Sequence, residues 1–242
     1  MIESEVFMTT KYGRQPAFAV CPDMPGRFAP VILYMDAPGM REELRGVARR
    51  ISNLGYFCLV PDLYYRLGML RFDIPRRNDA MSKVIHAAMT SLTISAVMDD
   101  TAGMIAFLDG HEKVKPGAIG CVGHCMSGPF AIAAAASFPR VKAAASLYGV
   151  NMVTNNADSP HLLLDRIGGE VYLGFAEIDP SVPPNVIPDF KAALEVAGTR
   201  HILETFSGAH HGFCFAARPD YHPVAAEASW ERMVELWARN LA

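Results

Sequence analysis

The pattern of hydrophobic and polar positions along the chain predicts short buried strands that alternate with helices. Strands are expected at residues 30–35, 56–60, 118–122, 141–147, 171–176 and 201–206, and the first of them is a continuous apolar run of the kind that burial on both faces requires. Helices are expected at residues 44–54, 94–108, 130–138, 189–196 and 225–241. This order predicts an α/β fold with a mostly parallel central sheet and helices on both faces.

Two segments fall outside this alternation. Residues 5–8 and 17–21 predict two short strands joined by a turn at 11–14, an N-terminal hairpin that a loop extends to residue 29. Residues 61–90 are irregular or weakly helical and are long for a connection, so we interpret them as a candidate lid or pocket wall. We expect one α/β domain over residues 1–242.

Composition and charge narrow the functional classes. The 242 residues are 51% hydrophobic, which is enough for a large core, and the net charge of -3 gives no reason to expect nucleic acid or an anionic membrane as a partner. The N-terminus has no apolar leader and no apolar run reaches the length of a bilayer span. We therefore expect a soluble, cytoplasmic protein, and the sequence leaves its oligomeric state open.

The five cysteines stand at irregular spacings, so we expect neither a disulfide framework nor a metal site. One of them, Cys125, lies in Gly-His-Cys-Met-Ser-Gly at residues 123–128, between a predicted strand and a predicted helix. This is the pattern of a nucleophile elbow with cysteine in place of serine. The helix N-terminus that follows would favour the thiolate. The alternative is a buried structural cysteine on an ordinary strand–helix turn.

Two further polar groups follow later strands. Asp179 comes after the strand at 171–176, and His210 and His211 come after the strand at 201–206. The chain order of nucleophile, acid and histidine is that of α/β-hydrolases. In such a triad a thiolate attacks an acyl carbonyl, the histidine transfers the proton, and the carboxylate orients the imidazole.

Asp36 ends the strand at residues 30–35, and ligands of open α/β sheets bind at such strand ends. A second interpretation is that Asp36 only caps the helix that follows.

These motifs resemble the dienelactone hydrolase family (carboxymethylenebutenolidases) over about residues 30–237. The resemblance is carried by the Cys125 elbow, Pro-Asp-Leu-Tyr-Tyr-Arg at 61–66, Asp-x-x-x-Pro at 179–183 and Gly-Ala-His-His-Gly-Phe at 208–213. It implies an α/β-hydrolase fold and assigns the catalytic histidine to His211, which Gly-Phe follows.

The resemblance also implies roles for other residues. The family carboxylate that holds the resting thiol and assists its activation matches Asp36, although the family usually has glutamate there. The backbone N–H groups of Ala37 and Met126 would form the oxyanion hole. An arginine that binds the substrate carboxylate matches Arg66, since a guanidinium pairs with a carboxylate through two parallel hydrogen bonds. The implied enzyme opens an enol lactone through an acyl-enzyme and needs no cofactor.

One departure concerns the substrate. The best-known family members have a second arginine four residues after the catalytic histidine, where this chain has Phe215. The arginines that could compensate are Arg218, Arg71, Arg76 and Arg77. Phe213 and Phe215 indicate an apolar pocket, and this favours a carboxylesterase or thioesterase for small neutral esters as the alternative.

A non-catalytic alternative also stands. Cys125 could be the oxidised thiol of a redox sensor, with Cys121 or Cys214 as the resolving cysteine.

Overall fold

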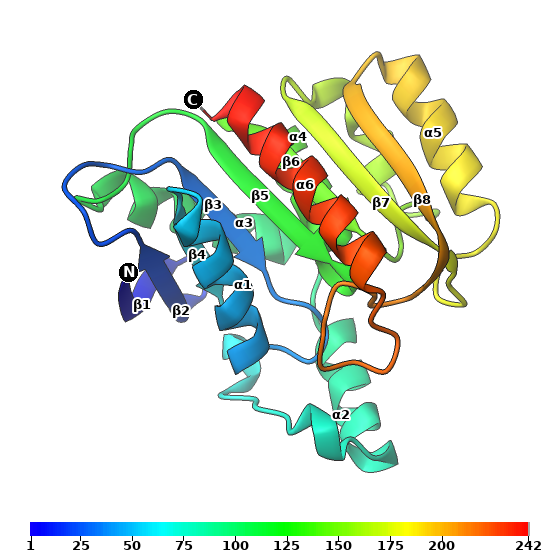
Figure 1. The fold of residues 1–242 in the computed structure, drawn as a ribbon, viewed down its shortest axis with the longest axis horizontal. Coiled ribbons are helices and arrows are strands. Elements are labelled where there is room, and N and C mark those ends of the chain that lie inside the picture. The colour runs from blue at the N-terminus through cyan, green and yellow to red at the C-terminus, as the bar shows by residue number, and fades with distance from the viewer. Residues whose placement is uncertain (242) are drawn as a thin grey trace. The chain divides into compact units, whose positions relative to one another are not determined.

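The structure is a computed structural model that describes residues 1–241 (Figure 1). The chain divides into two compact units, Met1–Ile119 and the part that begins at Gly120. Each unit contains strands that are almost wholly buried and helices that pack on them, and each is described here by itself.

The first unit holds four strands in the order β1-β2-β4-β3. β1 (Ile2–Thr10) and β2 (Gly13–Cys21) form an antiparallel hairpin, which confirms the predicted one and extends it. β4 (Phe57–Pro61) pairs antiparallel with β2 and parallel with β3 (Pro30–Tyr34). Every residue of β3 and β4 is buried, as their apolar sequences require.

Three helices complete this unit. α1 (Glu42–Asn53) packs on β4 and β2, and α3 (Ile94–Gly110) packs on β1. Residues 61–90, expected to be irregular or weakly helical, contain a regular helix, α2 (Asp79–Thr90). Its first turn is capped by Asn78, whose side chain accepts a hydrogen bond from the Met81 N–H at 2.9 Å.

The second unit holds the strands β5 (Ile119–His124), β6 (Val141–Leu147), β7 (Glu170–Ile178) and β8 (Arg200–His210) in that order. β7 pairs parallel with both β6 and β8. Three helices pack on these strands: α4 (Gly128–Ser137), α5 (Val186–Ala197) and α6 (Pro223–Asn240). Figure 1 shows α6, in red, crossing in front of the strands of this unit, with α5 alongside β8.

The apolar content of each helix follows how much of its surface is buried. Nine of the ten residues of α4 are apolar, and most of them are small. The residues from Gly128 to Ala135 are all buried. α6 buries one side, where the rings of Trp230 and Trp237 meet edge to face at 5.9 Å. The expected α/β architecture is confirmed, and its predicted strands and helices lie within a few residues of the observed ones.

Within residues 1–241, no single helix is long and apolar enough to cross a membrane. One bent pair, α2 with α3, satisfies that test of length and composition when the two are taken together, with an angle of 77° between them.

Candidate active site

The elbow around Cys125 has the geometry that its sequence predicts. β5 ends at His124, a single 3₁₀ turn covers Cys125–Ser127, and α4 begins at Gly128. Cys125 has a φ of 56°, in the left-handed region that non-glycine residues rarely occupy. Strain of this kind persists only where the surrounding structure imposes it, and it is common at functional sites.

The turn is possible because glycine stands on either side of it, at positions 123 and 128. A Cβ on Gly123 would lie 2.0 Å from the Ser127 carbonyl oxygen, and a Cβ on Gly128 would lie 2.4 Å from the Ser146 Oγ. Both positions therefore require glycine. Ser127 is buried, and its Oγ accepts a hydrogen bond from the His124 N–H at 2.9 Å and donates one to the His124 carbonyl at 3.0 Å. The serine hydroxyl closes the turn.

The pairing of β7 with β8 brings the acid and the histidine together. The two strands run parallel, and after a bulge between Ala176 and Ile178 the register pairs Ile178 with His210. Asp179 directly follows β7 and His211 directly follows β8, so the two side chains lie next to each other. His211 Nδ1 lies 2.7 Å from Asp179 Oδ2, and the Ser181 N–H donates to the other carboxylate oxygen at 2.9 Å. The Asp179 side chain is 3% exposed and is held at both oxygens.

His211 links this carboxylate to the thiol. Burial lowers the pKa of the His211 imidazolium, but hydrogen bonds to Asp179 and Cys125 and the charges of both groups outweigh it and raise that pKa to about 9. The imidazole therefore carries a proton at neutral pH, with the Asp179 carboxylate at its Nδ1. Asp179 and Cys125 therefore both act on His211 in the second unit, the first through a hydrogen bond to Nδ1.

The raised pKa of His211 predicts a pH-dependent stability. The ordinary pKa is 6.5 and the folded value is about 9, so the folded state binds the proton more tightly than the unfolded chain between these values. The stabilisation is fully present below pH 6.5 and is lost as the pH rises through 9. We expect the free energy of unfolding to fall by at most about 3 kcal/mol over this window. Urea unfolding at pH 6, 7.5 and 9.5 measures it.

Two variants show whether His211 causes this pH dependence: His211→Asn removes the group, and His201→Asn is its matched control. His201 lies in the same unit, where its Nδ1 is 2.8 Å from the Thr199 carbonyl. His211→Asn should lose most of the fall and His201→Asn should keep it. An undiminished fall in His211→Asn would show that another group is responsible.

Aromatic side chains surround the histidine. Tyr148, which follows β6, meets the His211 ring edge on at 5.1 Å and the Phe213 ring at 5.1 Å. Phe215 lies against His124 at 5.1 Å. Phe213 and Phe215 are 0% and 1% exposed, so they belong to the core of this unit and do not line an open apolar pocket. Arg218 lies over the Phe215 ring at 5.2 Å, and its Nη1 would be 2.7 Å from a Cβ on Gly212, the residue after His211.

The other cysteines differ from Cys125 in their surroundings. Burial raises the pKa of Cys121, and that thiol donates to the Ala131 carbonyl at 3.4 Å. Burial also raises the pKa of Cys214 to about 12. Both thiols therefore remain protonated at neutral pH, which makes them poor resolving partners for an oxidised Cys125.

Asp36 lies in the first unit, two residues beyond β3, and is fully buried. Arg41 binds both of its carboxylate oxygens through Nη1 and Nη2, and also binds Glu43 at 2.9 Å. The N-cap interpretation of Asp36 is wrong, because α1 begins at Glu42 after Arg41. Sequence reasoning did not single out Arg41, which lies in the loop between β3 and α1.

The two expected oxyanion-hole residues each lie in a fixed turn. Ala37 follows Asp36, and its carbonyl accepts a hydrogen bond from the Tyr64 hydroxyl at 2.8 Å. Met126 lies in the second unit, in the 3₁₀ turn directly after Cys125.

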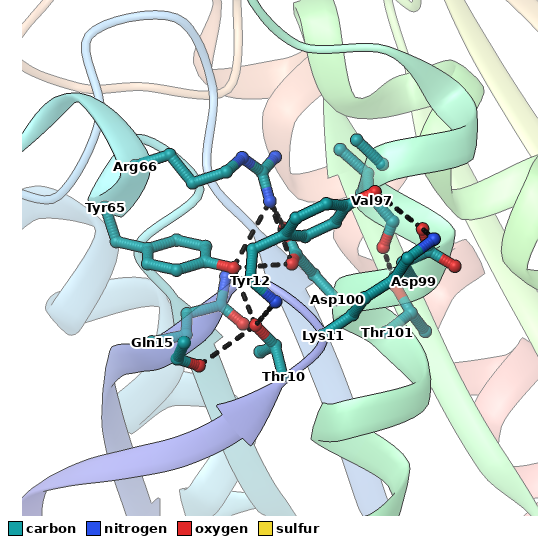
Figure 2. A network of polar contacts seen from close by, with 12 residues as sticks. Thr10, Lys11, Tyr12, Gln15, Tyr65, Arg66, Val97, Asp99, Asp100 and Thr101 are labelled. Carbon is teal, nitrogen blue, oxygen red and sulfur yellow. Dashed lines mark hydrogen bonds and ion pairs between the residues drawn. The ribbon is translucent and has the colours of Figure 1, made fainter.

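Arg66 is held by other residues of the first unit (Figure 2). Its Nη1 donates to both carboxylate oxygens of Asp100, at 2.9 and 2.7 Å, and to the Tyr65 hydroxyl at 3.2 Å. Asp100, on α3, is 0% exposed. Sequence reasoning missed this partner because 34 residues separate it from Arg66.

Comparisons with known proteins identify the family of this chain. Residues 16–241 match the model of the Dienelactone hydrolase family. The chain is 27% identical over 243 residues to a protein of Methylorubrum extorquens that bears the name "Putative carboxymethylenebutenolidase", covering 99% of this chain and 81% of that one. A protein of Synechocystis sp. with the same name is 29% identical over 222 residues, covering 89% and 88%.

A solved structure supports the fold alone. The "Putative Dienelactone Hydrolase" of Klebsiella pneumoniae superposes with a TM-score of 0.88 at 23% identity and covers 98% of both chains. With the family model matching nearly the whole sequence, the chain belongs to the dienelactone hydrolase family and is a hydrolase of the α/β-hydrolase fold.

Proposed function

We propose that this protein is a cysteine hydrolase that opens a carboxylated enol lactone through a Cys125–His211–Asp179 triad. The observation that carries the proposal is the hydrogen bond between Asp179 and His211, whose pKa both Asp179 and Cys125 raise, together with the strained backbone of Cys125. An imidazolium beside a thiol stabilises the thiolate, which is the nucleophilic form of cysteine. The names of its relatives support the substrate class.

The reaction then has two steps. The Cys125 thiolate attacks the lactone carbonyl, the ring C–O bond breaks, and the enolate leaves and takes a proton from the His211 imidazolium. The product at this stage is a thioester on Cys125. His211, now neutral and oriented by Asp179, removes a proton from water, whose oxygen attacks the thioester and expels the thiolate.

The charge that develops on the carbonyl oxygen needs hydrogen-bond donors. We assign this role to the backbone N–H groups of Ala37 and Met126, because donors fixed in turns cost no reorganisation when the charge forms. Asp36 is assigned to activation of the thiol. Its carboxylate is bound by Arg41, so that activation would require the Arg41 contact to loosen.

A direct test is to trap the acyl-enzyme. The protein is mixed with a dienelactone or an aryl ester, the reaction is stopped in acid within one turnover, and the peptide that contains Cys125 is weighed by mass spectrometry. The expected result is a mass gain equal to the acyl group on Cys125. Turnover of the ester with no such adduct would contradict the two-step reaction.

The second candidate is an esterase for small neutral esters, and one observation favours it. The charge of Arg66 is balanced by the buried carboxylate of Asp100, which weakens its attraction for a substrate carboxylate. The two candidates therefore differ in what Arg66 does.

Arg66→Gln separates these candidates. For a carboxylated lactone we expect KM to rise about tenfold or more with kcat nearly unchanged, because the guanidinium binds a group remote from the reacting carbonyl. KM for a neutral aryl ester should stay within about twofold. Steady-state absorbance assays give both values.

Arg239→Gln is the matched control, since Arg239 also pairs with a buried carboxylate, Glu170 of the second unit, at 2.7 Å. An unchanged KM for the lactone in Arg66→Gln would assign the enzyme to neutral esters.

A further inference from the structure

Arg66 lies in a network of polar and aromatic side chains of the first unit, which Figure 2 shows. Its guanidinium carbon lies 4.8 Å from the Tyr12 ring centroid and 5.1 Å from the Tyr65 ring centroid. Tyr12 comes from the turn between β1 and β2, and Tyr65 is the neighbour of Arg66 in the chain. The two rings restrict where the planar guanidinium can lie.

Hydrogen bonds fix its rotation. The Tyr65 hydroxyl lies 2.7 Å from Thr10 Oγ1 and donates to Asp100 Oδ1 at 2.8 Å. The carboxylate of Asp100 in turn accepts both of its contacts with Arg66 from Nη1. The hairpin turn is tied to the same helix, since Lys11 and the Tyr12 hydroxyl donate to Asp99 at 2.9 and 2.7 Å.

The opposite edge of the guanidinium remains unused. Every hydrogen bond that Arg66 makes within residues 1–241 goes through Nη1, and Nη2 is buried with no hydrogen-bond partner in this part of the chain. A buried, charged N–H group without an acceptor is costly, so such a group is a position where a ligand oxygen is expected. The Arg66 side chain as a whole is 24% exposed although Nη2 is buried, so a substrate oxygen reaches Nη2 only after a small shift of the guanidinium or of its neighbours.

The geometry points to Asp100 as a positioning residue that turns Arg66 so that its Nε–Nη2 edge is presented to the substrate carboxylate. This inference rests on the proposed function, in which Arg66 binds that carboxylate. An arginine offers two edges for bidentate pairing, and Asp100 occupies Nη1, which belongs to one of them. The Nε–Nη2 edge then remains as the only intact pair of parallel donors.

The charges are consistent with this arrangement. Burial lowers the pKa of Arg66, but the hydrogen bond and charge of Asp100 outweigh it and raise that pKa, so the guanidinium stays charged. Burial raises the pKa of Asp100, while hydrogen bonds from Tyr65 and Arg66 oppose that rise. Hydrogen bonds from Arg66 and Tyr65 therefore stabilise the ionised form of Asp100 against the effect of burial.

The test is Asp100→Asn, which keeps an oxygen acceptor and removes the charge and one acceptor. We expect KM for a dienelactone to rise about tenfold, with kcat and the KM for a neutral aryl ester within about twofold of wild type. The control is Asp109→Asn, the same change at an exposed position of α3, which should leave KM and kcat for both substrates unchanged. Arg66→Gln combined with Asp100→Asn should be no worse than Arg66→Gln alone, since Asp100 acts through Arg66.

A second variant covers the case in which Asp100→Asn fails to fold. Tyr65→Phe keeps the ring over Arg66 and removes only the hydroxyl that binds Asp100 and Arg66. It should raise KM for the lactone about threefold and leave the neutral ester unchanged. Thermal unfolding of each variant checks that it is folded.

The outcomes are distinguishable. If Arg66→Gln raises KM for the lactone while Asp100→Asn and Tyr65→Phe do not, the inference is wrong and the proposed function stands. Equal losses on both substrates in Asp100→Asn would give Asp100 a structural role only and overturn the inference. If Arg66→Gln leaves KM unchanged, the substrate assignment fails and the inference fails with it.

Discussion

Cys125→Ala is expected to lower the turnover of every ester and lactone substrate by roughly 10⁴-fold or more, because alanine removes the atom that forms the acyl-enzyme. His211 and Asp179 cannot replace the sulfur, and the remaining donors would only bind and polarise the carbonyl. Absorbance assays with a dienelactone and with an aryl ester measure the loss. Circular dichroism should show an unchanged fold, because alanine also fits the space at the elbow.

Cys214→Ala provides the control, since Cys214 lies three residues after His211 and its thiol, 3.7 Å from the Ser229 hydroxyl, stays protonated at neutral pH. It should keep at least about half of the wild-type activity. Full activity in Cys125→Ala would refute the thiol mechanism. Reversible oxidation of Cys125 in a wild type without any esterase activity would instead support a redox function, despite the protonated state of Cys121 and Cys214.

Asp179→Asn should give the second largest loss, up to about 10⁴-fold in kcat. The amide is nearly isosteric, but its NH₂ group can face His211 Nδ1 and then favours the wrong tautomer. The imidazolium also loses the charge that stabilises it, so the pKa of His211 should fall from about 9 towards its ordinary value. The pH dependence of kcat/KM and an NMR titration of His211 check the two effects together.

The control for this charge removal is Asp165→Asn, at an exposed position of the same unit. It should leave both kcat and the His211 titration unchanged. Retention of wild-type kcat in Asp179→Asn, with a shifted titration, would mean that orientation of the imidazole does not limit the reaction.

Much of the site in the second unit follows from local sequence. Gly123 and Gly128 predict a turn that excludes a Cβ, and both close approaches are present. Asp179 and His211 stand just past their strands, and parallel pairing of β7 with β8 brings such residues to the same edge. The sequence could not predict the register shift between Ala176 and Ile178, where β8 advances four residues against two on β7, because such an irregularity is set by the pairing of the two strands.

The first unit was harder to predict, because its polar contacts join residues far apart in the chain. Only Ile85 and Ala88 are buried in α2, so no apolar stripe reveals that helix. Asp36 resembles a helix cap in sequence, yet Arg41 binds its carboxylate. Arg66 was expected to be a substrate ligand only, and its pairing with Asp100 depends on how α3 lies beside the hairpin.

The register of β7 and β8 has a consequence for refolding. Since Asp179 and His211 meet only when Ile178 pairs with His210, a chain in which β8 has not joined β7 has no oriented histidine, whatever the state of the elbow. Recovery of esterase activity after dilution from denaturant therefore reports the joining of one specific pair of strands, whereas circular dichroism reports helix formation throughout the chain. A lag between the two signals would time that step.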